Sequence, residues 1–234
     1  MLASGRPGKD IFTTPSQLEN MITKEEFKDK VRRKIKGWYS CKDHEDKAIE
    51  RISRNRDTIV ALLEEAGVPD TLLEYLDSSG FYYRTSSPTG HHNYPGGLAE
   101  HCYGTYTIAL EEASRIGIPK DSVIRAALLH DLCKADRFWF KGRTIRKHTP
   151  VTRMDDSHSV RSVFLIGECG MALTEPERLA IRWHMKGFKY HSRDPREEAD
   201  HQKAVKEPLW RIVFNADKKD ASMHPGTSGK TARG

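Results

Sequence analysis

The sequence predicts an all-α protein, a helical bundle with one possible small β-hairpin. Apolar residues recur at helical spacing in most of the segments between glycines and prolines. Only residues 137–146 (RFWFKGRTIR) show two short apolar-bearing arms around a turn, which is the pattern of a hairpin. A chain of 234 residues is long enough for one substantial core. We therefore expect one main domain built from helices.

Three helices are expected in an N-terminal segment, residues 1–80, that packs on the core. The first follows a Thr-Pro opening and carries Phe27, Val31 and Ile35 at nearly helical spacing. The second has a stripe of isoleucine and leucine and ends at Gly67, a residue type favoured just after a helix. The third is short and begins after a proline. The three helices are expected within 13–39, 43–67 and 70–80.

The main domain is assigned to residues 81–221 and begins with a loop. Residues 81–97 (FYYRTSSPTGHHNYPGG) are rich in glycine, proline, serine and aromatic residues, and long ordered loops in compact domains tend to be functional. Within this loop, His91 and His92 either line the mouth of a site or form part of a glycine-bounded turn. Helices are then expected over 98–116, 120–134, 157–171, 175–185 and 204–221, followed by a polar, glycine-rich tail over 222–234 that we expect to be flexible.

Composition and charge narrow the class of protein. The net charge of +6 and the pI of about 9.1 favour anionic partners, or describe a generally basic surface. The N-terminus has no continuous apolar stretch, and no run approaches the roughly 18 apolar residues that a membrane span requires. The four cysteines are widely spaced and form no C-x-x-C pair, so a reduced, cytoplasmic location is expected.

A set of polar residues lies on or beside apolar helical stripes. Burying such groups costs free energy unless they are paired or bound to a metal. Each alone fits a hydrogen-bonded core residue, but together they lie on five successive predicted helices, as ligands gathered at one end of a bundle do. Imidazole combined with carboxylate is typical of a catalytic divalent ion. The candidate metal ligands are His101, His130, Asp131, His158, His184 and Asp217.

The ordered series of His101, His130-Asp131 and Asp217 resembles the H…HD…D signature of the HD-domain metal-dependent phosphohydrolases. The segment HDLCKAD is similar to their frequent HDxGK form, with Cys133 in place of the glycine, and the resemblance covers about residues 94–221. The additional His158 and His184 resemble the subset of the family with two metals. The resemblance implies that His101, His130, Asp131 and Asp217 hold a first divalent ion (Mn, Fe, Ni, Co, Zn or Mg) and that Asp131, His158 and His184 hold a second.

The resemblance also implies a mechanism in which a metal-activated water attacks phosphorus, with Asp131 and Lys134 as catalytic residues. Lys134 would neutralise charge on the phosphoryl oxygens, although a lysine at this position also suits an ordinary helix C-terminus.

The expected substrate is a nucleotide or a single-stranded nucleic acid. Residues 134–153 contain seven basic residues and one acidic residue, interleaved with aromatic side chains. Basic groups follow phosphates and aromatic rings stack on bases, so this segment either receives a nucleotide or is a solvated hairpin that covers the bundle. Arg161 is either a phosphate contact or a surface arginine. The candidate substrate-binding residues are Lys134, Arg137, Lys141, Arg143 and Arg161.

Three functions remain open at this point. The first is a phosphoester hydrolase acting on nucleotides or oligonucleotides. The second is an oxygenase that uses two irons on the same fold. The third is a basic nucleic-acid-binding or regulatory module with a structural metal, although a structural zinc site usually closes with four ligands and gains nothing from six. The sequence gives no indication of the oligomeric state.

Overall fold

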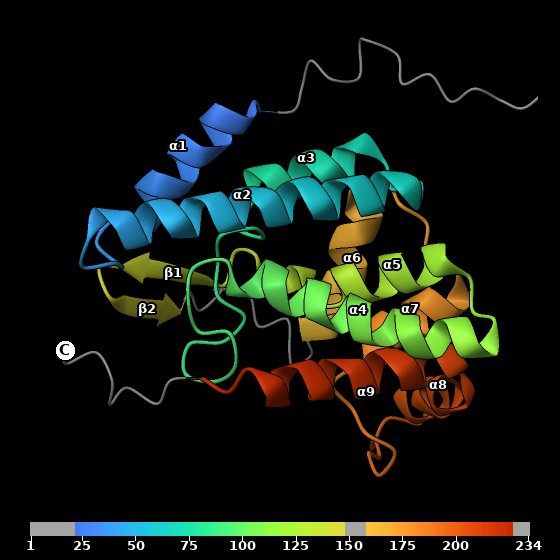
Figure 1. Ribbon diagram of the computed structural model, residues 1–234. Helices are drawn as coiled ribbons and strands as arrows, with labels where there is room; N and C mark the ends of the chain where they lie inside the picture. Colours follow the sequence, from blue (N-terminus) through green and yellow to red (C-terminus); the bar gives the residue numbers. More distant parts are fainter. Residues whose placement is uncertain (1–21, 148–157, 227–234) are drawn as a thin grey trace, which may run out of the picture.

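Residues 22–147 and 158–226 are described in the computed structural model, and helices dominate them (Figure 1). The first half contains α1 (Lys24–Ile35), α2 (Lys42–Glu65), α3 (Asp70–Ser78), α4 (Gly97–Ile116) and α5 (Lys120–Leu129). A short 3-10 turn (Leu132–Lys134) and the strands β1 (Phe138–Lys141) and β2 (Thr144–Lys147) follow. The second half contains α6 (His158–Glu168), α7 (Glu175–Trp183), α8 (Pro195–Lys206) and α9 (Pro208–Met223). The predicted all-α fold is confirmed.

The helices lie in layers, with α1 and α3 at the top of the view in Figure 1, then α2, then α4 and α5 beneath it, and α9 below α4. Helix α4 packs most extensively against α9 and α5. Apolar side chains from α1, α2 and α3 join those of α4, α5, α7 and α9 in one continuous core, with Phe27, Ile52 and Leu128 fully buried. The N-terminal helices therefore share a core with the rest of the protein.

A buried ion pair fixes α3 against α2. Arg56 donates from Nε to Oδ1 of Asp77 at 2.6 Å, and both side chains are buried. A paired charge can stay buried, whereas either charge alone would be costly.

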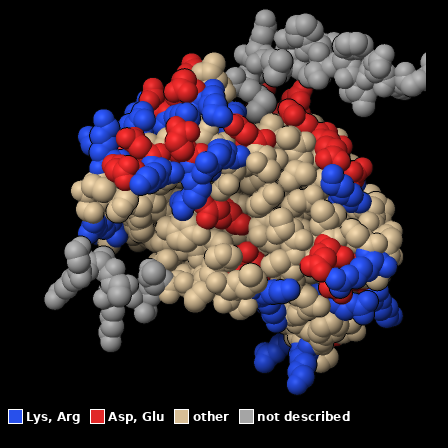
Figure 2. Space-filling view, viewed as in Figure 1, with Lys and Arg blue, Asp and Glu red and all other residues tan. Residues whose placement is uncertain are grey.

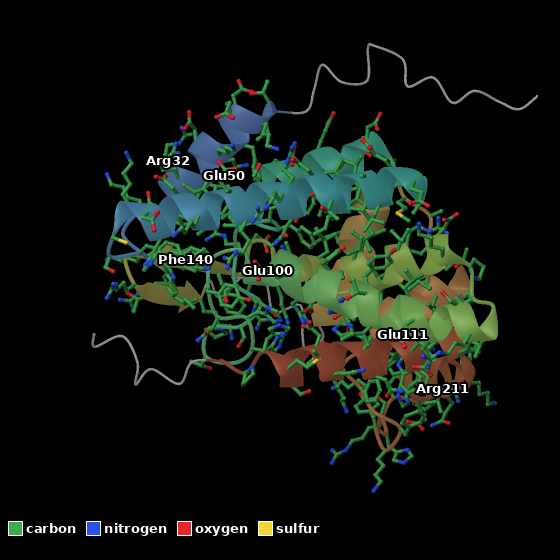
Figure 3. All side chains as sticks on the ribbon, viewed as in Figure 1. Arg32, Glu50, Glu100, Glu111, Phe140 and Arg211 are labelled. Atoms are coloured by element: carbon green, nitrogen blue, oxygen red, sulfur yellow. The ribbon has the colours of Figure 1, made fainter. Side chains whose placement is uncertain are left out.

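The predicted hairpin is also confirmed. Strands β1 and β2 pair antiparallel, with Phe138 opposite Lys147 and Trp139 opposite Arg146. The ring of Phe140, labelled in Figure 3, lies 4.9 Å from that of Trp38 between centroids, so the hairpin rests against the turn between α1 and α2.

Two predicted helix boundaries are wrong. The helix expected over 120–134 ends at Leu129, and the 3-10 turn replaces its last part. The helix expected over 204–221 is two helices, because Pro208 lacks the backbone N–H that would continue α8. Helix α8 has no broad apolar stripe and buries only His201 and Ala204, so periodicity did not reveal it.

The C-terminal boundary also differs from the expectation. Helix α9 continues to Met223, and His224 lies with its ring centroid 4.4 Å from that of His92. Part of the predicted tail, residues 227–234, lies outside the described residues.

Charged side chains of both signs mix over α1 and α2 on the face shown in Figure 2. No helix within 22–147 or 158–226 combines the length and the apolar character that a bilayer span needs.

Candidate metal centre

Four helices bring predicted ligands to one buried place. His101 lies on α4 and Asp217 on α9. His130 caps the C-terminus of α5 and is followed directly by Asp131, while His184 caps the C-terminus of α7. Each of these five side chains is nine-tenths buried or nearly so. The sixth predicted ligand, His158, begins α6, but its side chain lies outside what the structure describes.

The ligand atoms converge on each other. Nε2 of His101 lies 3.1 Å from Oδ1 of Asp217 and 3.6 Å from Oδ2 of Asp131. Nε2 of His130 lies 3.4 Å from Oδ2 of Asp131 and 3.4 Å from Nε2 of His101. Nε2 of His184 lies 3.5 Å from Oδ1 of Asp131. Asp131 therefore lies between the histidines, with one carboxylate oxygen toward His101 and His130 and the other toward His184.

The two helix ends orient their histidines by the same local contact. Nδ1 of His130 donates to the carbonyl of Ala127 at 2.8 Å, and Nδ1 of His184 donates to the carbonyl of Ile181 at 2.8 Å. A carbonyl only accepts, so Nδ1 carries the proton and Nε2 keeps a lone pair directed into the cluster. Both imidazoles are thus prepared to be ligands.

Two buried atoms of the cluster have no hydrogen-bond partner among the described residues. They are Oδ1 of Asp131 and Nε2 of His184, both electron-pair donors. An unpaired buried polar atom costs about 1–3 kcal/mol, and a bound cation would remove this cost. Groups of imidazole and carboxylate atoms here lie within 4.8 Å of one another. The residues present fit a divalent metal ion.

The charge state of the cluster suits a cation. Burial opposes ionisation of Asp131, but the ammonium of Lys134 and the imidazole of His130 outweigh it and hold the pKa well below the usual range. Burial likewise opposes ionisation of Asp217, but the hydrogen bond from His101 and the nearby imidazoles of His130 and His184 lower the pKa of Asp217 to about 2. Burial lowers the pKa of His130. Burial opposes protonation of His101, but its hydrogen bonds to Asp217 and Asp220 outweigh it and raise its pKa to about 9. At neutral pH the cluster offers two carboxylates and an uncharged His130 imidazole, and a metal ion would displace a proton from His101.

Asp220, which the sequence did not predict, supports His101 from behind. Its Oδ2 lies 2.7 Å from Nδ1 of His101 and 2.9 Å from Nε2 of His92. A Cβ at Gly104 would lie 2.0 Å from Oδ1 of Asp220, so only glycine allows α9 to bring this carboxylate so near α4. Two spacings in the sequence could have indicated this contact. Asp220 follows Asp217 by one helical turn, and Gly104 follows His101 by one turn.

Hydrogen bonds extend this support to the molecular surface. Nδ1 of His92 lies 3.0 Å from the hydroxyl of Tyr94, which donates to Glu100 at 2.8 Å, and Glu100 pairs with Arg51 at 2.8 Å. Glu100 is labelled in Figure 3 at the start of α4. His92 is 2% exposed and has a φ of 49°, so it belongs to the turn and does not line the site mouth.

The other predicted site residues divide into two sets. Lys134 is 9% exposed, and its Nζ lies 2.6 Å from Oδ2 of Asp131, so it belongs to the centre. Lys134 and Arg137 line a cavity beside the cluster. Lys141 and Arg143 are exposed on the hairpin and outside the lining of this cavity.

Arg161 donates to Asp136 at 2.9 Å, and both side chains are about half exposed, at 44% and 51%. Cys133, which replaces the glycine of HDxGK, is 3% exposed, and its backbone N–H donates to Oγ of Ser162 at 3.1 Å. The cysteine side chain therefore packs without opening the end of α5. His201 is fully buried beside Trp183.

Fold and site together define a helical protein with a buried histidine and aspartate centre suited to a divalent metal ion. The family model of the HD domain matches residues 98–222, more than half of the chain, and the chain therefore belongs to the HD domain family. Members of this family are typically metal-dependent hydrolases. No curated protein and no solved structure matches the chain.

Proposed function

We propose that this protein is a metal-dependent phosphohydrolase that cleaves a phosphoester bond in a nucleotide or an oligonucleotide. The observation that supports the proposal best is the position of Lys134. Its ammonium contacts Asp131 in the cluster and also lines a neighbouring cavity with two further basic residues, Arg137 and Lys147. Positive charge beside a metal centre suits a substrate that carries phosphate.

In this proposal His101, His130, Asp131 and Asp217 hold an ion, and His184 extends the set on the far side of Asp131. A divalent ion in such a site supplies a water of lowered pKa and positive charge for phosphoryl oxygens. Asp131 stays ionised because Lys134 and His130 lower its pKa. Burial of the cluster removes competing water and strengthens the electrostatic interactions within it.

Lys134 has a second task in the proposal. A phosphate bound at the ion would lie close to this ammonium, which would neutralise negative charge that develops on the phosphoryl oxygens. Contacts of the substrate with Lys141, Arg143 and Arg161 remain predictions from the sequence.

The test is a hydrolysis screen with added metal. Purified protein would be stripped of metal and assayed with mononucleotides, cyclic nucleotides and short oligonucleotides after addition of Mn²⁺, Fe²⁺, Ni²⁺, Co²⁺, Zn²⁺ or Mg²⁺. Asp131→Asn is expected to lower hydrolysis at least 100-fold. Asp121→Asn, at an exposed position near the start of α5, is the matched control and should keep full activity.

Other outcomes would favour the other functions. Equal hydrolysis by the Asp131→Asn variant and the parent protein would sink the proposal, provided circular dichroism shows that both are folded. A product that forms only in the presence of oxygen would favour an oxygenase. Binding of metal with no turnover of any substrate would favour a structural metal in a regulatory module.

A further inference from the structure

We infer that the cavity between the 85–92 loop and β1 is a subsite for a second phosphate group, next to the phosphate that is hydrolysed. This inference rests on the proposed function and names the substrate class more closely: a molecule with two linked phosphates, as in a phosphodiester chain or a nucleoside polyphosphate. The cavity has a volume of about 260 Å³ and is lined by Ser86, Ser87, Pro88, His91, Lys134, Arg137, Phe138 and Lys147.

The charge of the lining selects an anion. Lys134, Arg137 and Lys147 are basic, and none of the described residues that line the cavity is acidic. Lysine and arginine form the strong charge-assisted hydrogen bonds that phosphate oxygens accept. The volume is several times the roughly 30 Å³ that one water occupies in the liquid, so the cavity has room for a group larger than a water.

The cavity adjoins the metal centre through two residues. Lys134 lines it and lies 2.6 Å from Asp131 between Nζ and Oδ2. His91 also lines it, and its ring centroid lies 4.5 Å from that of His101. A phosphate beside the cluster would meet Lys134, and Arg137 and Lys147 would remain for a second group of the same molecule.

The serine side of the cavity is held in shape before any ligand binds. The hydroxyl of Thr85 donates to the carbonyl of His92 at 2.8 Å, which closes the loop. The hydroxyl oxygen of Ser87 accepts from the backbone N–H of Gly90 at 2.8 Å, so its own proton is available to donate. A prearranged donor adds affinity because little ordering is needed on binding.

The opposite wall combines an aromatic ring with a guanidinium. Phe138 is 5% exposed, and Cζ of Arg137 lies 5.8 Å from its ring centroid. Lys147 is the strand partner of Phe138. Neighbouring residues of a strand point to opposite faces, so Arg146 is directed away from the cavity and does not line it.

The experiment compares substrates with one and two phosphates in matched variants. Arg137→Ala and Lys147→Ala are expected to raise KM about tenfold for a 5′-phosphorylated dinucleotide or for ADP, and less than twofold for the mononucleotide AMP. Arg146→Ala should change neither value. Lys147 is exposed, so its variant should remain folded, as a thermal melt would confirm.

The two diphosphate substrates separate the sources of the second phosphate. A KM effect confined to the dinucleotide indicates a nucleic-acid strand, and one confined to ADP indicates a nucleoside polyphosphate. Equal effects of Lys147→Ala on one-phosphate and two-phosphate substrates, or no effect on either, would overturn the inference.

A direct binding measurement tests the subsite independently of hydrolysis. If the parent protein cleaves no phosphoester, calorimetry with pyrophosphate still measures the affinity of the cavity for an anion with two linked phosphates. Weaker pyrophosphate binding in Arg137→Ala and Lys147→Ala, with Arg146→Ala unchanged, would support the subsite although the proposed function had failed. Unchanged pyrophosphate binding in both lining variants would exclude the subsite.

Discussion

Replacing Asp220 with asparagine tests how much the carboxylate behind His101 contributes to metal binding. Asparagine has nearly the same shape but removes the negative charge that lies 2.7 Å from Nδ1 of His101. Burial opposes ionisation of Asp220, but hydrogen bonds from His101 and His92 outweigh it and hold its pKa well below the usual range. The parent protein therefore keeps a full charge at this position near pH 7.

The size of the effect follows from this contact. A carboxylate bound to the far nitrogen of a ligating histidine fixes the ring orientation and raises the basicity of the ligating nitrogen, and its loss typically weakens metal binding by about 10-fold to 100-fold. That range corresponds to about 1.4–2.8 kcal/mol. Asp220 also contacts His92 at 2.9 Å, so the upper part of the range is expected.

Mn²⁺ titration by isothermal calorimetry would measure the dissociation constants of the Asp220→Asn variant and the parent protein. Lys219→Ala, an exposed neighbour on α9, is the control and should bind Mn²⁺ as the parent does. The Gly104→Ala variant should also weaken Mn²⁺ binding, because the added Cβ would lie 2.0 Å from Oδ1 of Asp220 and must displace this carboxylate. A dissociation constant for Asp220→Asn within twofold of the parent value would refute the reasoning.

Three further predictions concern stability. Arg56→Ala should lower the free energy of unfolding by about 3–5 kcal/mol in urea denaturation, because it leaves Asp77 buried without its partner, and a loss below about 1 kcal/mol would contradict this. Burial opposes ionisation of Glu177, but its hydrogen bond from Arg125 outweighs this and lowers the pKa of Glu177 in the folded protein. The ionised Glu177 therefore stabilises the fold fully above the ordinary glutamate pKa of about 4.3, and this stabilisation is lost as the pH falls through the lower folded value. The stability difference between the parent and Glu177→Gln should accordingly be full at pH 7 and shrink in acid, whereas a difference independent of pH would argue against the charge. Mn²⁺ at about 100 times its dissociation constant should stabilise the parent protein by about 2.7 kcal/mol and the Asp131→Asn variant by much less. Thermal melts with and without EDTA would measure this difference. Equal stabilisation of both proteins would place the ion elsewhere.

Helical periodicity and the order of the polar residues predicted much of the centre. His101, His130, Asp131, His184 and Asp217 interrupt apolar stripes, and the structure brings all five together. Desolvation makes unpaired polar residues rare on such stripes, so several of them in order favour a common position in the core.

Other features depend on contacts between distant segments. The spacing of Asp220 places it on the same face of α9 as Asp217, but its role depends on the approach of α4 at Gly104. Lys134 and Lys147 belong to one basic segment in the sequence, but only the hairpin register places Lys147 beside Phe138 at the cavity. Pairing across strands and helices sets these positions, and periodicity within one element does not contain that information.

Anomalous diffraction from crystals soaked in Mn²⁺ would test most directly whether the buried cluster is a metal centre. The structure predicts a strong anomalous peak within about 2.5 Å of Nε2 of His101, Nε2 of His130 and a carboxylate oxygen of both Asp131 and Asp217, and no such peak in crystals of Asp131→Asn. A cluster that stays free of anomalous density at saturating Mn²⁺, with its imidazoles and carboxylates bonded only to each other, would contradict the assignment.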